Sequence, residues 1–482
     1  MSSTSTSSLA FPFNVVIMAA GKGTRMKSIV PKVLQRLGGK PLVQHVLDTA
    51  ASLGAGQVVV VTGHSADVVE AALLKANVQA HSDRASQGGL QFVRQMPQLG
   101  TGHCVQQAVP CLPDDESVTL ILSGDVPLTQ PETLRTLMAQ CSGQHLALLT
   151  IEFDDPTGYG RVIRDTSGLG VASIIEHKDA TQAQRGLREC YSGIMAAPTQ
   201  LLKRWLAQLD NNNAAGEFYL TDVVKHAVSG GTPVVATCIT DTAQVDGVNS
   251  PVQLAALERA LQQRIAQGLM EGGTRLADPA RLDVRGVLTC GQDVEIDVNC
   301  VLAGSVTLGN NVRIGANCVI TNAVIGDNAV IHPFTHIEGQ AGQPVRIGSG
   351  SLIGPFARLR PGADLAEEVH IGNFVEIKNA TLAKGAKANH LAYIGDAAVG
   401  ERVNYGAGSI TANYDGAYKH KTVIEPDVHV GSNCVLVAPV TIGAGCTIGA
   451  GSTITKDTPA GGLAVARGKQ VNVANWARPQ KR

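Results

Sequence analysis

The sequence predicts two folded units of different architecture, an α/β unit built on a largely parallel sheet and then a parallel β-helix. Apolar runs of strand length alternate with helical segments from residue 14 to about 240, and this alternation is typical of an α/β unit. Two of those runs end in glycine-rich or acidic loops. Between Val294 and Thr455 an aliphatic residue recurs at steps of six, which is the signature of a parallel β-helix.

The six-residue repeat carries the β-helix prediction. Ile314, Ile353, Ile371 and Ile442 are among the repeating residues, and each precedes a glycine. In this fold a rung is a short strand plus a corner, three rungs close one coil, and the repeating side chains stack inside. At about 18 residues per coil the segment gives roughly nine coils. No rung can bury its side chain without its neighbours, so the coils must stack.

Two interruptions of the repeat mark where functional side chains are expected. The step shortens to five between Ile320 and Ile325, and the phase is lost between Lys384 and Lys421. A loop that leaves a regular scaffold is more often a binding device than a packing device. We therefore expect insertions and chemistry in these two places.

Length and composition exclude several classes of protein. A chain of 482 residues is too long for one core. The net charge of −1 gives no broad positive field, so no nucleic-acid partner is expected. The sequence has no run of about 18 uncharged apolar residues, which predicts no membrane span. The ten cysteines form no C-x-x-C pair, so reduced thiols and a cytoplasmic location are expected.

The α/β unit offers a first candidate site at the ends of its strands. The expected strands are Val15–Met18, Val58–Val61 and Thr119–Leu122, with helices beginning at Pro41 and Pro131. Parallel sheets bind ligands beyond the carboxyl ends of their strands. The glycine loop Ala19–Met26 follows the first strand, and Asp125 follows the third.

The loop matches neither of the two common phosphate-binding glycine patterns, and alone it is equally well read as a tight turn. Its surroundings favour a phosphate site. Backbone N–H groups can bind phosphate oxygens, Arg25 and Lys32 add two cations, and Asp125 is a suitable Mg²⁺ ligand.

A second candidate site lies on the β-helix, which by itself needs no special polar residues. Histidine is the side chain best suited to remove a proton from an attacking amine near neutral pH, and His390 is the candidate base. A lone histidine is more often a surface residue. Here Arg360 and Lys378 could bind a sugar phosphate, and Tyr393 and Asn404 could bind hydroxyls or the amine.

The motifs of both regions together resemble one enzyme family. The loop from Ala19 to Met26, Pro31-Lys32, Gly100-Thr101-Gly102 and Gly124-Asp125 resemble the sugar-1-phosphate nucleotidylyltransferases. Four further segments narrow the resemblance: Asp155–Arg161, Glu176–Asp179, Asn211–Asn213 and Gly216–Asp222. With the β-helix attached, residues 14 to 480 resemble the bacterial bifunctional N-acetylglucosamine-1-phosphate uridylyltransferase/glucosamine-1-phosphate N-acetyltransferases.

The resemblance implies a Rossmann-like nucleotidyltransferase domain, a helical arm and a left-handed parallel β-helix. The expected boundaries are a disordered tail at 1–13, a uridylyltransferase domain at 14–250, a linker helix at 251–272 and an acetyltransferase domain at 273–482. It also implies a homotrimer through the β-helix, and a product, UDP-N-acetylglucosamine, that supplies peptidoglycan and lipopolysaccharide synthesis.

For the uridylyl site the resemblance implies that one Mg²⁺ is held by Asp125 and Asn249, and that Lys32 and Arg25 stabilise the reacting phosphate. The nucleotide and sugar contacts implied are Met18, Ala19, Ala20, Gly21, Lys32, Gln95, Gly100, Thr101, Ser123, Asp125, Gly160, Glu176, Tyr191 and Asn249. Two positions depart from the family pattern. Tyr191 stands where the family usually has asparagine, and Ser123 where an aromatic residue is often found.

For the acetyl site the resemblance implies that His390 is the base and that glucosamine-1-phosphate contacts Arg360, Lys378, Tyr393 and Asn404. The residues implied for acetyl-CoA are Ala407, Asn413, Tyr414, Ser432, Ala450 and Arg467. The co-substrates would be acetyl-CoA, UTP and N-acetylglucosamine-1-phosphate.

Three alternatives stay open at the level of sequence. The first is a single-activity nucleotidyltransferase whose β-helix only assembles subunits. The second is a β-helix enzyme of carbonic anhydrase type, with zinc on some of His332, His336, His370, His390, His420 and His429. The third is a non-catalytic translation-factor subunit. The joint presence of Lys32, Asp125, Asn249 and His390 argues against the third.

Overall fold

The computed structural model describes residues 11–80 and 89–480. The chain divides into two compact units, Met1–Leu261 and Gln262–Arg482, and the boundary falls inside helix α8, Pro251–Glu271. Most of the expected N-terminal tail, residues 1–13, lies outside the described residues. Phe13 already belongs to strand β1 and is buried.

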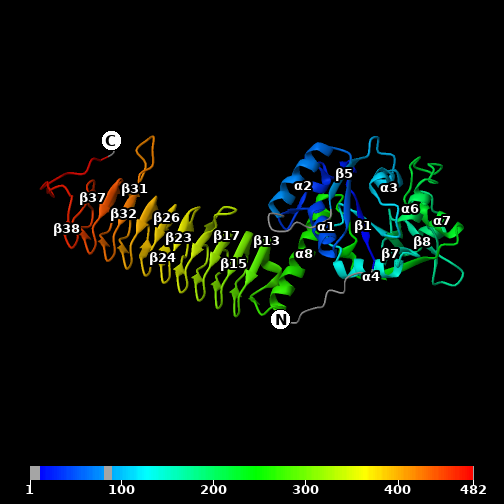
Figure 1. Cartoon of the computed structure of the whole chain (residues 1–482). Coiled ribbons are helices and arrows are strands. Elements are labelled where there is room, and N and C mark those ends of the chain that lie inside the picture. The colour runs from blue at the N-terminus through cyan, green and yellow to red at the C-terminus, as the bar shows by residue number, and fades with distance from the viewer. Residues whose placement is uncertain (1–10, 81–88, 481–482) are drawn as a thin grey trace. The chain divides into compact units, whose positions relative to one another are not determined.

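The first unit is an α/β fold around a sheet of order β11-β7-β10-β6-β1-β4-β5 (Figure 1). These strands are β1 Phe13–Met18, β4 Gln57–Thr62, β5 Leu90–Arg94, β6 Val118–Ser123, β7 Leu146–Glu152, β10 Glu189–Pro198 and β11 Val234–Ile239. All pair in parallel except β10, which runs antiparallel to β6 and β7. A hairpin, β8 Arg161–Arg164 and β9 Val171–Ile175, joins the sheet through β10. The predicted parallel sheet is therefore confirmed, with one antiparallel strand.

Helices cover both faces of this sheet, because its strands are apolar on both sides. One core contains residues from α1 Leu42–Leu53, α2 Ala66–Ala80 and α4 Pro131–Cys141. The other contains residues from α3 Thr101–Ala108, α6 Thr199–Leu206 and α7 Asp222–Ser229.

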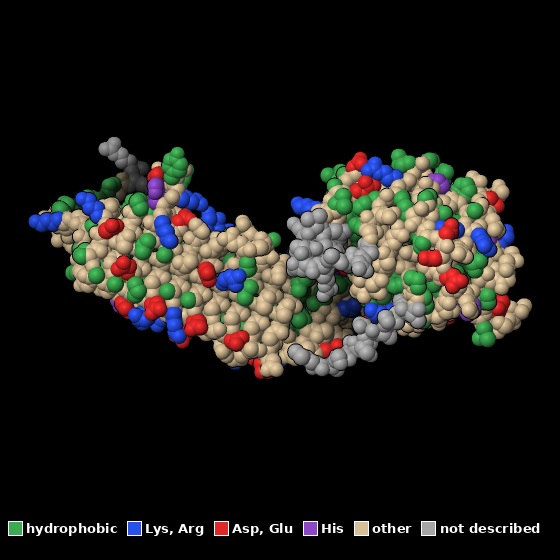
Figure 2. All heavy atoms as spheres, viewed as in Figure 1, with side chains coloured by type: hydrophobic (Ala, Val, Ile, Leu, Met, Phe, Trp, Pro, Cys, Tyr) green, Lys and Arg blue, Asp and Glu red, His purple; other side chains and the backbone are tan. Residues whose placement is uncertain are grey.

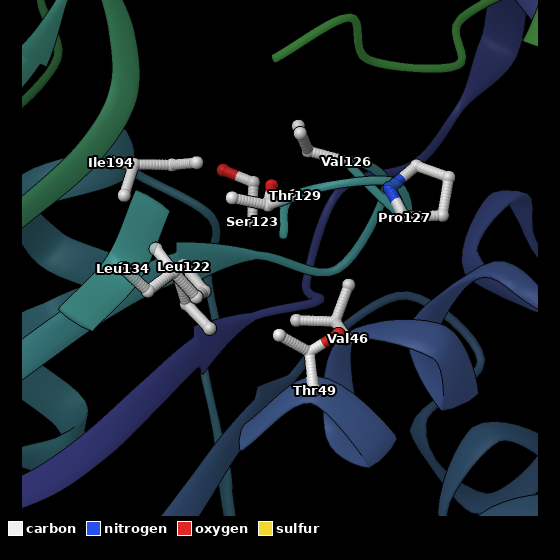
Figure 3. A pocket seen from close by; sticks show the side chains of 9 residues that line it. All are labelled: Val46, Thr49, Leu122, Ser123, Val126, Pro127, Thr129, Leu134 and Ile194. Carbon is white, nitrogen blue, oxygen red and sulfur yellow. The ribbon is translucent and has the colours of Figure 1, made fainter. Parts of the chain in front are cut away.

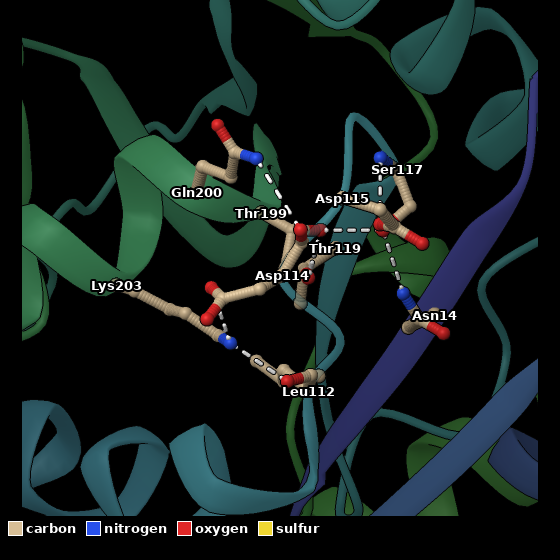
Figure 4. Close-up of polar contacts among 9 residues, drawn as sticks. All are labelled: Asn14, Leu112, Asp114, Asp115, Ser117, Thr119, Thr199, Gln200 and Lys203. Atoms are coloured by element: carbon tan, nitrogen blue, oxygen red, sulfur yellow. Dashed lines mark hydrogen bonds and ion pairs between the residues drawn. The ribbon is translucent and has the colours of Figure 1, made fainter.

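A buried polar network ties Thr199, which follows β10 and begins α6, to β1 and the start of β6, at the end of β6 away from Asp125 (Figure 4). Asn14 Nδ2 donates to Ser117 Oγ at 3.0 Å, and Ser117 Oγ lies 3.0 Å from Thr199 Oγ1. Thr199 Oγ1 also lies 2.9 Å from Thr119 Oγ1. Since buried polar groups are stabilising only when they are bonded, this network favours one register of the antiparallel strand.

The second unit is a parallel β-helix with three faces (Figure 1). The first face is a sheet of eleven strands among the described residues: β12 Arg275–Leu276, β14 Glu295–Ile296, β16 Arg313–Ile314, β18 Val330–Ile331, β21 Leu352–Ile353, β24 His370–Asn373, β27 Lys387–His390, β30 Asn404–Tyr405, β33 His429–Val430, β36 Thr447–Ile448 and β38 Leu463–Ala464. Nine of these strands, β14 to β36, lie between Val294 and Thr455, in agreement with the nine coils predicted for that segment, and β12 and β38 extend the β-helix beyond it at both ends.

The other two faces belong to a second sheet of the β-helix. The second face has β19 His336–Glu338, β22 Arg358–Leu359, β25 Glu376–Lys378, β28 Tyr393–Gly395, β31 Ile410–Ala412, β34 Val435–Val437 and β37 Thr453–Ile454. The third has β20 Val345–Ile347, β23 Ala363–Leu365, β26 Ala380–Leu382, β29 Ala397–Val399, β32 Thr422–Ile424 and β35 Val440–Ile442. In the first coils β13 Leu282–Cys290, β15 Cys300–Leu308 and β17 Val319–Ile325 run through both faces.

The repeating aliphatic residues fill the interior, as predicted, and form one continuous core from Leu282 to Ile454. The predicted loss of phase from Lys384 onward is wrong. Ala388, Tyr405 and Thr411 continue the inward positions and are buried. Their residue types hide the repeat, because none of the three is the Ile, Leu or Val that marks the other inward positions. The true interruption is shorter, a hairpin of residues 413–421 with an isolated bridge between Tyr414 and Lys419.

Steps shorter or longer than six residues are accommodated at the corners of the β-helix, and the interior positions stay in register. The step of five predicted after Ile320 recurs after Ile377 and after Ile394. The corners within these three short steps contain Asn322, Asn379 and Asp396, all with positive φ, a conformation that asparagine and aspartate adopt more readily than most residues. A second loop, which the sequence reading missed, leaves at Gln340 and returns at Gln343 on the same edge of the prism.

Within the described parts of the chain, no helix has the length and apolar character needed to cross a membrane.

The inward and outward positions of β17 predict that alanine substitutions at two neighbouring residues have very different effects on stability. Ile320 is 0% exposed and Val319 is 39% exposed. Ile320→Ala should lower the free energy of unfolding by about 2–5 kcal/mol, because it leaves a cavity in the core. Val319→Ala should cost about 0.5 kcal/mol or less. Denaturant-dependent hydrogen exchange of the β-helix strands measures both, and equal effects would contradict the assignment of inward and outward positions.

Candidate functional sites

The first candidate site is centred on the ammonium group of Lys32. Lys32 Nζ donates to Asp125 Oδ2 at 2.5 Å and to Asn249 Oδ1 at 3.2 Å. The Lys32 and Asp125 side chains are only 14% and 19% exposed. A cation therefore already sits between two oxygen atoms of the type that Mg²⁺ prefers, so this donor set suits a divalent metal ion.

Neighbouring strand ends explain why these residues meet. Met18, the last residue of β1, pairs with Ser123, the last residue of β6, so the glycine loop and Asp125 start side by side. Gly124 N–H donates to the Met18 carbonyl at 2.9 Å. Gly23 has φ +61°, and a Cβ there would come within 2.6 Å of Lys32 Cβ. Glycine at position 23 thus leaves the space through which Lys32 reaches Asp125.

Asn249 comes from a distant part of the chain and is placed by backbone bonds. Val248 N–H donates to the Asp125 carbonyl at 3.0 Å, and Asn249 N–H donates to Gln253 Oε1 at 2.8 Å. Gly247 lies against Asp125, since a Cβ there would be 3.5 Å from Asp125 Oδ2. The carboxylate and the amide oxygen are therefore held on a fixed backbone.

A small cavity is lined by residues that flank Asp125 in the sequence (Figure 3). Its lining comes from α1, β6, the loop after β6, α4 and β10, and includes Ser123, Val126 and Ile194. Its volume of about 10 Å³ is the space that one water molecule takes. The cavity is too small for a substrate.

The residues expected to bind the base form a second cluster. Gln95 is buried, and its amide nitrogen donates to the Gly100 carbonyl at 2.8 Å. Gly100 has φ +114°, and a Cβ there would lie 2.9 Å from Phe218 N. Thr101 Oγ1 accepts from Leu220 N–H at 3.1 Å. The Gly100–Gly102 motif and the Gly216–Asp222 motif are thus packed together.

The residues expected to bind the sugar form a third cluster. Gly160 accepts at its carbonyl from Tyr191 N–H at 2.9 Å, and a Cβ on Gly160 would be 3.7 Å from both Glu176 carboxylate oxygens. Thr221 Oγ1 donates to Glu176 Oε1 at 2.9 Å. Burial raises the pKa of Glu176, and the Thr221 hydroxyl opposes that rise.

Tyr191, one of the two departures from the family pattern, is buried beside Glu176. Burial and then the Glu176 charge raise the pKa of its hydroxyl well above the usual value. That hydroxyl has no hydrogen-bond partner among the described residues. It is a buried polar group whose bonding capacity this part of the chain leaves unused.

The remaining residues of the first set lie on the loop itself. Met18 ends β1, Ala19 and Ala20 are buried directly after it, and Gly21 is exposed. Arg25 is exposed on a short 3-10 helix, Thr24–Met26. The structure does not bring Arg25 into any contact with Asp125 or Asn249 that compares with that of Lys32.

The second candidate site is on the second face of the β-helix. Arg360 N–H donates to the Ile377 carbonyl at 2.8 Å, which puts Arg360 one coil before Lys378 in the same outward column. Arg360 Nη1 donates to Glu376 Oε1 at 2.8 Å. The positive charge of Arg360, followed by Lys419, lowers the pKa of Lys378. Three cations are therefore gathered here, and a phosphate group would relieve their repulsion.

His390 lies where the first face turns into the second. Its Nδ1 is 2.8 Å from Asn373 Oδ1, the residue next to it in the preceding coil. An oxygen acceptor at Nδ1 selects the tautomer with hydrogen on Nδ1, so Nε2 keeps its lone pair. His390 is exposed, and its other ring nitrogen is accessible to a substrate.

Three of the residues expected to bind acetyl-CoA continue the His390 column. Gly408 N–H donates to the His390 carbonyl at 3.4 Å, Asn433 N–H to the Ala407 carbonyl and Gly451 N–H to the Ser432 carbonyl, each at 2.8 Å. His390, Ala407, Ser432 and Ala450 therefore follow one corner of the prism, here called the His390 corner. A Cβ on Gly451 would be 3.7 Å from Arg467 Cδ, so Arg467 reaches the same corner.

Asn413 and Tyr414 lie at the opposite edge of the second face. Asn379 lies at this edge two coils earlier, so the edge is here called the Asn379 corner. Asn413 Nδ2 donates to Asp396 Oδ2, and Asn379 Nδ2 donates to Asp396 Oδ1 at 2.5 Å. Tyr414 is exposed on the hairpin, which projects as the orange loop near β31 in Figure 1 and carries apolar and basic side chains in Figure 2. Asn404 is on the first face, opposite Lys387 of the preceding coil.

The structure adds residues to which the sequence reading gave no role: Asn373, Glu376, Lys419 and Thr221. Asn373 precedes His390 by 17 residues, which is about one coil, so the period itself predicted their contact. Lys419 lies on the hairpin, and no period relates it to Lys378.

The zinc alternative finds no support. The described residues include no group of three or more His, Cys, Asp or Glu side chains placed to hold a metal ion. His420 instead pairs with Asp415, with its Nε2 at 2.6 Å from Asp415 Oδ2.

The sequence matches known families in both units. A model described as the MobA-like NTP transferase domain matches residues 15–190, and one described as bacterial transferase hexapeptide (six repeats) matches residues 289–322 and 421–456. The bifunctional protein GlmU of Polaromonas naphthalenivorans (strain CJ2) is 68% identical over 98% of this chain and 98% of its own. The chain is a member of the bifunctional protein GlmU family.

More distant GlmU proteins match over the same length. The bifunctional protein GlmU of Azoarcus sp. (strain BH72) is 53% identical over 97% of this chain and 99% of its own. As a GlmU protein with both domain types, the chain is an enzyme that combines a nucleotidyltransferase with a hexapeptide acyltransferase. The single-activity and non-catalytic alternatives are therefore set aside.

Solved structures add little to this assignment. The crystal structure of UDP-glucose pyrophosphorylase complexed with UDP-glucose aligns with 53% of this chain and 100% of its own at 17% identity and a TM-score of 0.43. A likeness this low carries no further conclusion.

Asp125→Ala tests the first site. The substitution removes one of two oxygen atoms around the cation position, and metal-dependent pyrophosphate release should fall by about 10²-fold or more. Asp114→Ala is the matched control, because Asp114 is an exposed carboxylate that pairs with Lys203 at 3.0 Å near the opposite end of β6. Near-normal release by the Asp125 variant would remove that residue from the metal site.

Asn373→Ala tests the second site. Without the acceptor at Nδ1, the His390 ring loses its preferred tautomer and orientation, and acetyl transfer should fall by about tenfold. Asn310→Ala, several coils earlier, removes a comparable bond, that from Gln292 N–H at 2.9 Å, and should leave the rate unchanged. A rate of free CoA formation equal in both variants contradicts the role assigned to Asn373.

Proposed function

We propose that the protein makes UDP-N-acetylglucosamine in two reactions, one on each unit. The β-helix transfers an acetyl group from acetyl-CoA to glucosamine-1-phosphate, and the α/β unit transfers uridylyl from UTP to the N-acetylated sugar phosphate. The observation that carries the proposal is that the His390–Asn373 pair stands at one edge of the β-helix face that carries the Arg360–Lys378 column. A β-helix used only for assembly has no need of an oriented base and clustered cations on one face.

In the uridylyl reaction a phosphate oxygen of N-acetylglucosamine-1-phosphate attacks the α-phosphorus of UTP. A new P–O bond forms, the bond to the bridging oxygen breaks, and pyrophosphate leaves. The attacking oxygen is already ionised near neutral pH, so no protein base is needed. The protein contributes alignment and positive charge, the latter from Lys32 and Arg25. Gln95, Gly100 and Thr101 are proposed to hold the uracil, and Gly160, Glu176 and Tyr191 the sugar.

Asp125 and Asn249 are proposed to hold Mg²⁺. The fit rests on the position of Lys32 Nζ, which shows that a cation is stable between the two oxygen atoms. Two protein ligands suffice, since Mg²⁺ commonly binds through one or two protein oxygens, substrate phosphates and water. The ion would neutralise charge on the phosphates. Lys32 must then turn from Asp125 toward the nucleotide.

In the acetyl reaction the amine of glucosamine-1-phosphate attacks the thioester carbonyl of acetyl-CoA. The N–C bond forms, Nε2 of His390 takes the amine proton, and the C–S bond breaks to release the CoA thiolate, which then takes a proton. Arg360 and Lys378 are proposed to bind the sugar phosphate, with Tyr393 and Asn404 on the sugar. Ala407, Asn413, Tyr414, Ser432, Ala450 and Arg467 are proposed to line the acetyl-CoA site.

A homotrimer through the β-helix is the proposed assembly. Three stacked rings, Phe334, Phe356 and Phe374, follow the His390 corner with centroids 5.0 and 5.4 Å apart and are 51%, 46% and 56% exposed. A ridge of exposed aromatic rings favours burial against another protein surface. Another copy packed there would lie beside His390 and could enclose acetyl-CoA.

Release of free CoA thiol, with and without glucosamine-1-phosphate, tests the proposal. Release that requires the amino sugar is the expected result, and His390→Ala should slow it by about 10²–10⁴-fold. The same variant should still form pyrophosphate from UTP and N-acetylglucosamine-1-phosphate at the normal rate, because that site lies in the other unit.

Two results would count against the proposal. No release of thiol from protein that forms pyrophosphate normally would reduce the β-helix to assembly. A loss below tenfold in the His390 variant would mean that another group is the base.

A further inference from the structure

Tyr393, a residue proposed to bind the amino sugar, lies over a glycine. Gly395 is the last residue of β28 and is buried. A Cβ on Gly395 would overlap the Tyr393 hydroxyl and come within 2.5 Å of its Cζ and 2.8 Å of its Cε1. The ring therefore extends along its own strand, and its hydroxyl occupies the space that a side chain at position 395 would fill.

That space belongs to the column of cations on the second face. Gly395 pairs with Lys378 in the preceding coil, and Arg360 stands one coil earlier still. Neighbouring strands of a sheet are about 4.8 Å apart. The Tyr393 hydroxyl thus becomes the third member of the column, one strand spacing beyond Lys378, within reach of a sugar whose phosphate binds Arg360 and Lys378.

The peptide of Gly395 is fixed from inside the β-helix. Thr411 takes an inward position and is 1% exposed, where the preceding coils of this face have Ile377 and Ile394. Gly395 N–H donates to Thr411 Oγ1 at 2.8 Å, and the Thr411 hydroxyl donates to the Gly395 carbonyl at 3.0 Å. A buried hydroxyl is costly unless it is bonded, and both bonds of this one go to the backbone of Gly395, the residue beneath the Tyr393 ring.

We propose that Gly395 is a positioning residue of the amino-sugar site. Its missing side chain, with the backbone held by Thr411, sets the Tyr393 hydroxyl beside Lys378 so that it bonds the bound glucosamine-1-phosphate. This inference rests on the proposed acetyltransferase activity and on the proposed role of Tyr393 in it.

Gly395→Ala is the first test, and its backbone permits the change, since Gly395 is not among the residues with positive φ. The alanine Cβ should push the ring away from the column. We expect KM for glucosamine-1-phosphate to rise about 3- to 10-fold, the effect of losing one hydrogen bond. KM for acetyl-CoA should stay unchanged, which a general loss of folding would not produce.

A double-mutant cycle with Tyr393→Ala separates positioning from other effects. With the ring removed, the alanine at 395 has nothing to displace, so Gly395→Ala should add no further change to KM. The proposal is overturned if Gly395→Ala raises KM equally in both backgrounds, or leaves it unchanged in the wild-type background.

Two further variants complete the test. Thr411→Val keeps the shape of the side chain but frees the Gly395 peptide, and it should raise the same KM. Gly468→Ala is the matched control, because a Cβ there would meet nothing within 4 Å. A Thr411→Val variant with normal KM removes Thr411 from the proposal.

Crystal structures of the wild-type and Gly395→Ala proteins test the packing claim apart from activity. A displaced Tyr393 ring in a protein that releases no CoA thiol would mean that the packing claim holds and the proposed function fails. An undisplaced ring overturns the positioning role whatever the activity.

Discussion

Each coil of the β-helix must return one side chain to the same interior column on each face, and this constraint determines where the rest of that unit can vary. A shift of one residue would turn the buried set outward, so no strand tolerates a net insertion. Extra residues leave and re-enter at a corner, as the hairpin of residues 413–421 does between Thr411 and Ile424, both of which stay inward. The fixed interior is what allows corners and outward positions to carry chemistry.

The same register builds the proposed acetyl site. Residues 17 or 18 apart become neighbours on a rigid surface, so Asn373 meets His390 and Lys378 meets Gly395. No helix or mobile loop is needed to bring them together, and side chains on strands are held more precisely than those on loops. The α/β unit uses a different device. There the loop after β1 and the loop after β6 start from paired residues, and Asn249 is added from far along the chain.

Much of this could be predicted, and the failures have physical reasons. The repeat identified the β-helix because aliphatic residues dominate its interior. It failed between Lys384 and Thr411, where Ala388 and Ala386 fill a narrow part of the core, and Tyr405 and Thr411 fill inward positions with polar residues. Asp125 and the glycine loop were expected together because both follow buried strands. The contact of Lys419 with Lys378 could not be predicted, because Lys419 lies on a hairpin and no sequence period relates it to Lys378.

Both candidate sites are proposed to bind a phosphate, but the charges around their cations differ before the phosphate binds. In the α/β unit Lys32 is neutralised by Asp125 at 2.5 Å, so the cation is stable before any substrate arrives, and a nucleotide must compete for it. On the β-helix Arg360, Lys378 and Lys419 repel one another more than the nearby Glu376 and Asp396 carboxylates offset, and the pKa of Lys378 falls. A bound phosphate removes that repulsion. The first arrangement suits a site that accepts a metal ion together with its nucleotide, because Asp125 and Asn249 would hold the ion and Lys32 would then be free to bind the phosphates. The second suits a sugar phosphate that binds without a metal, because the protein alone supplies the positive charge.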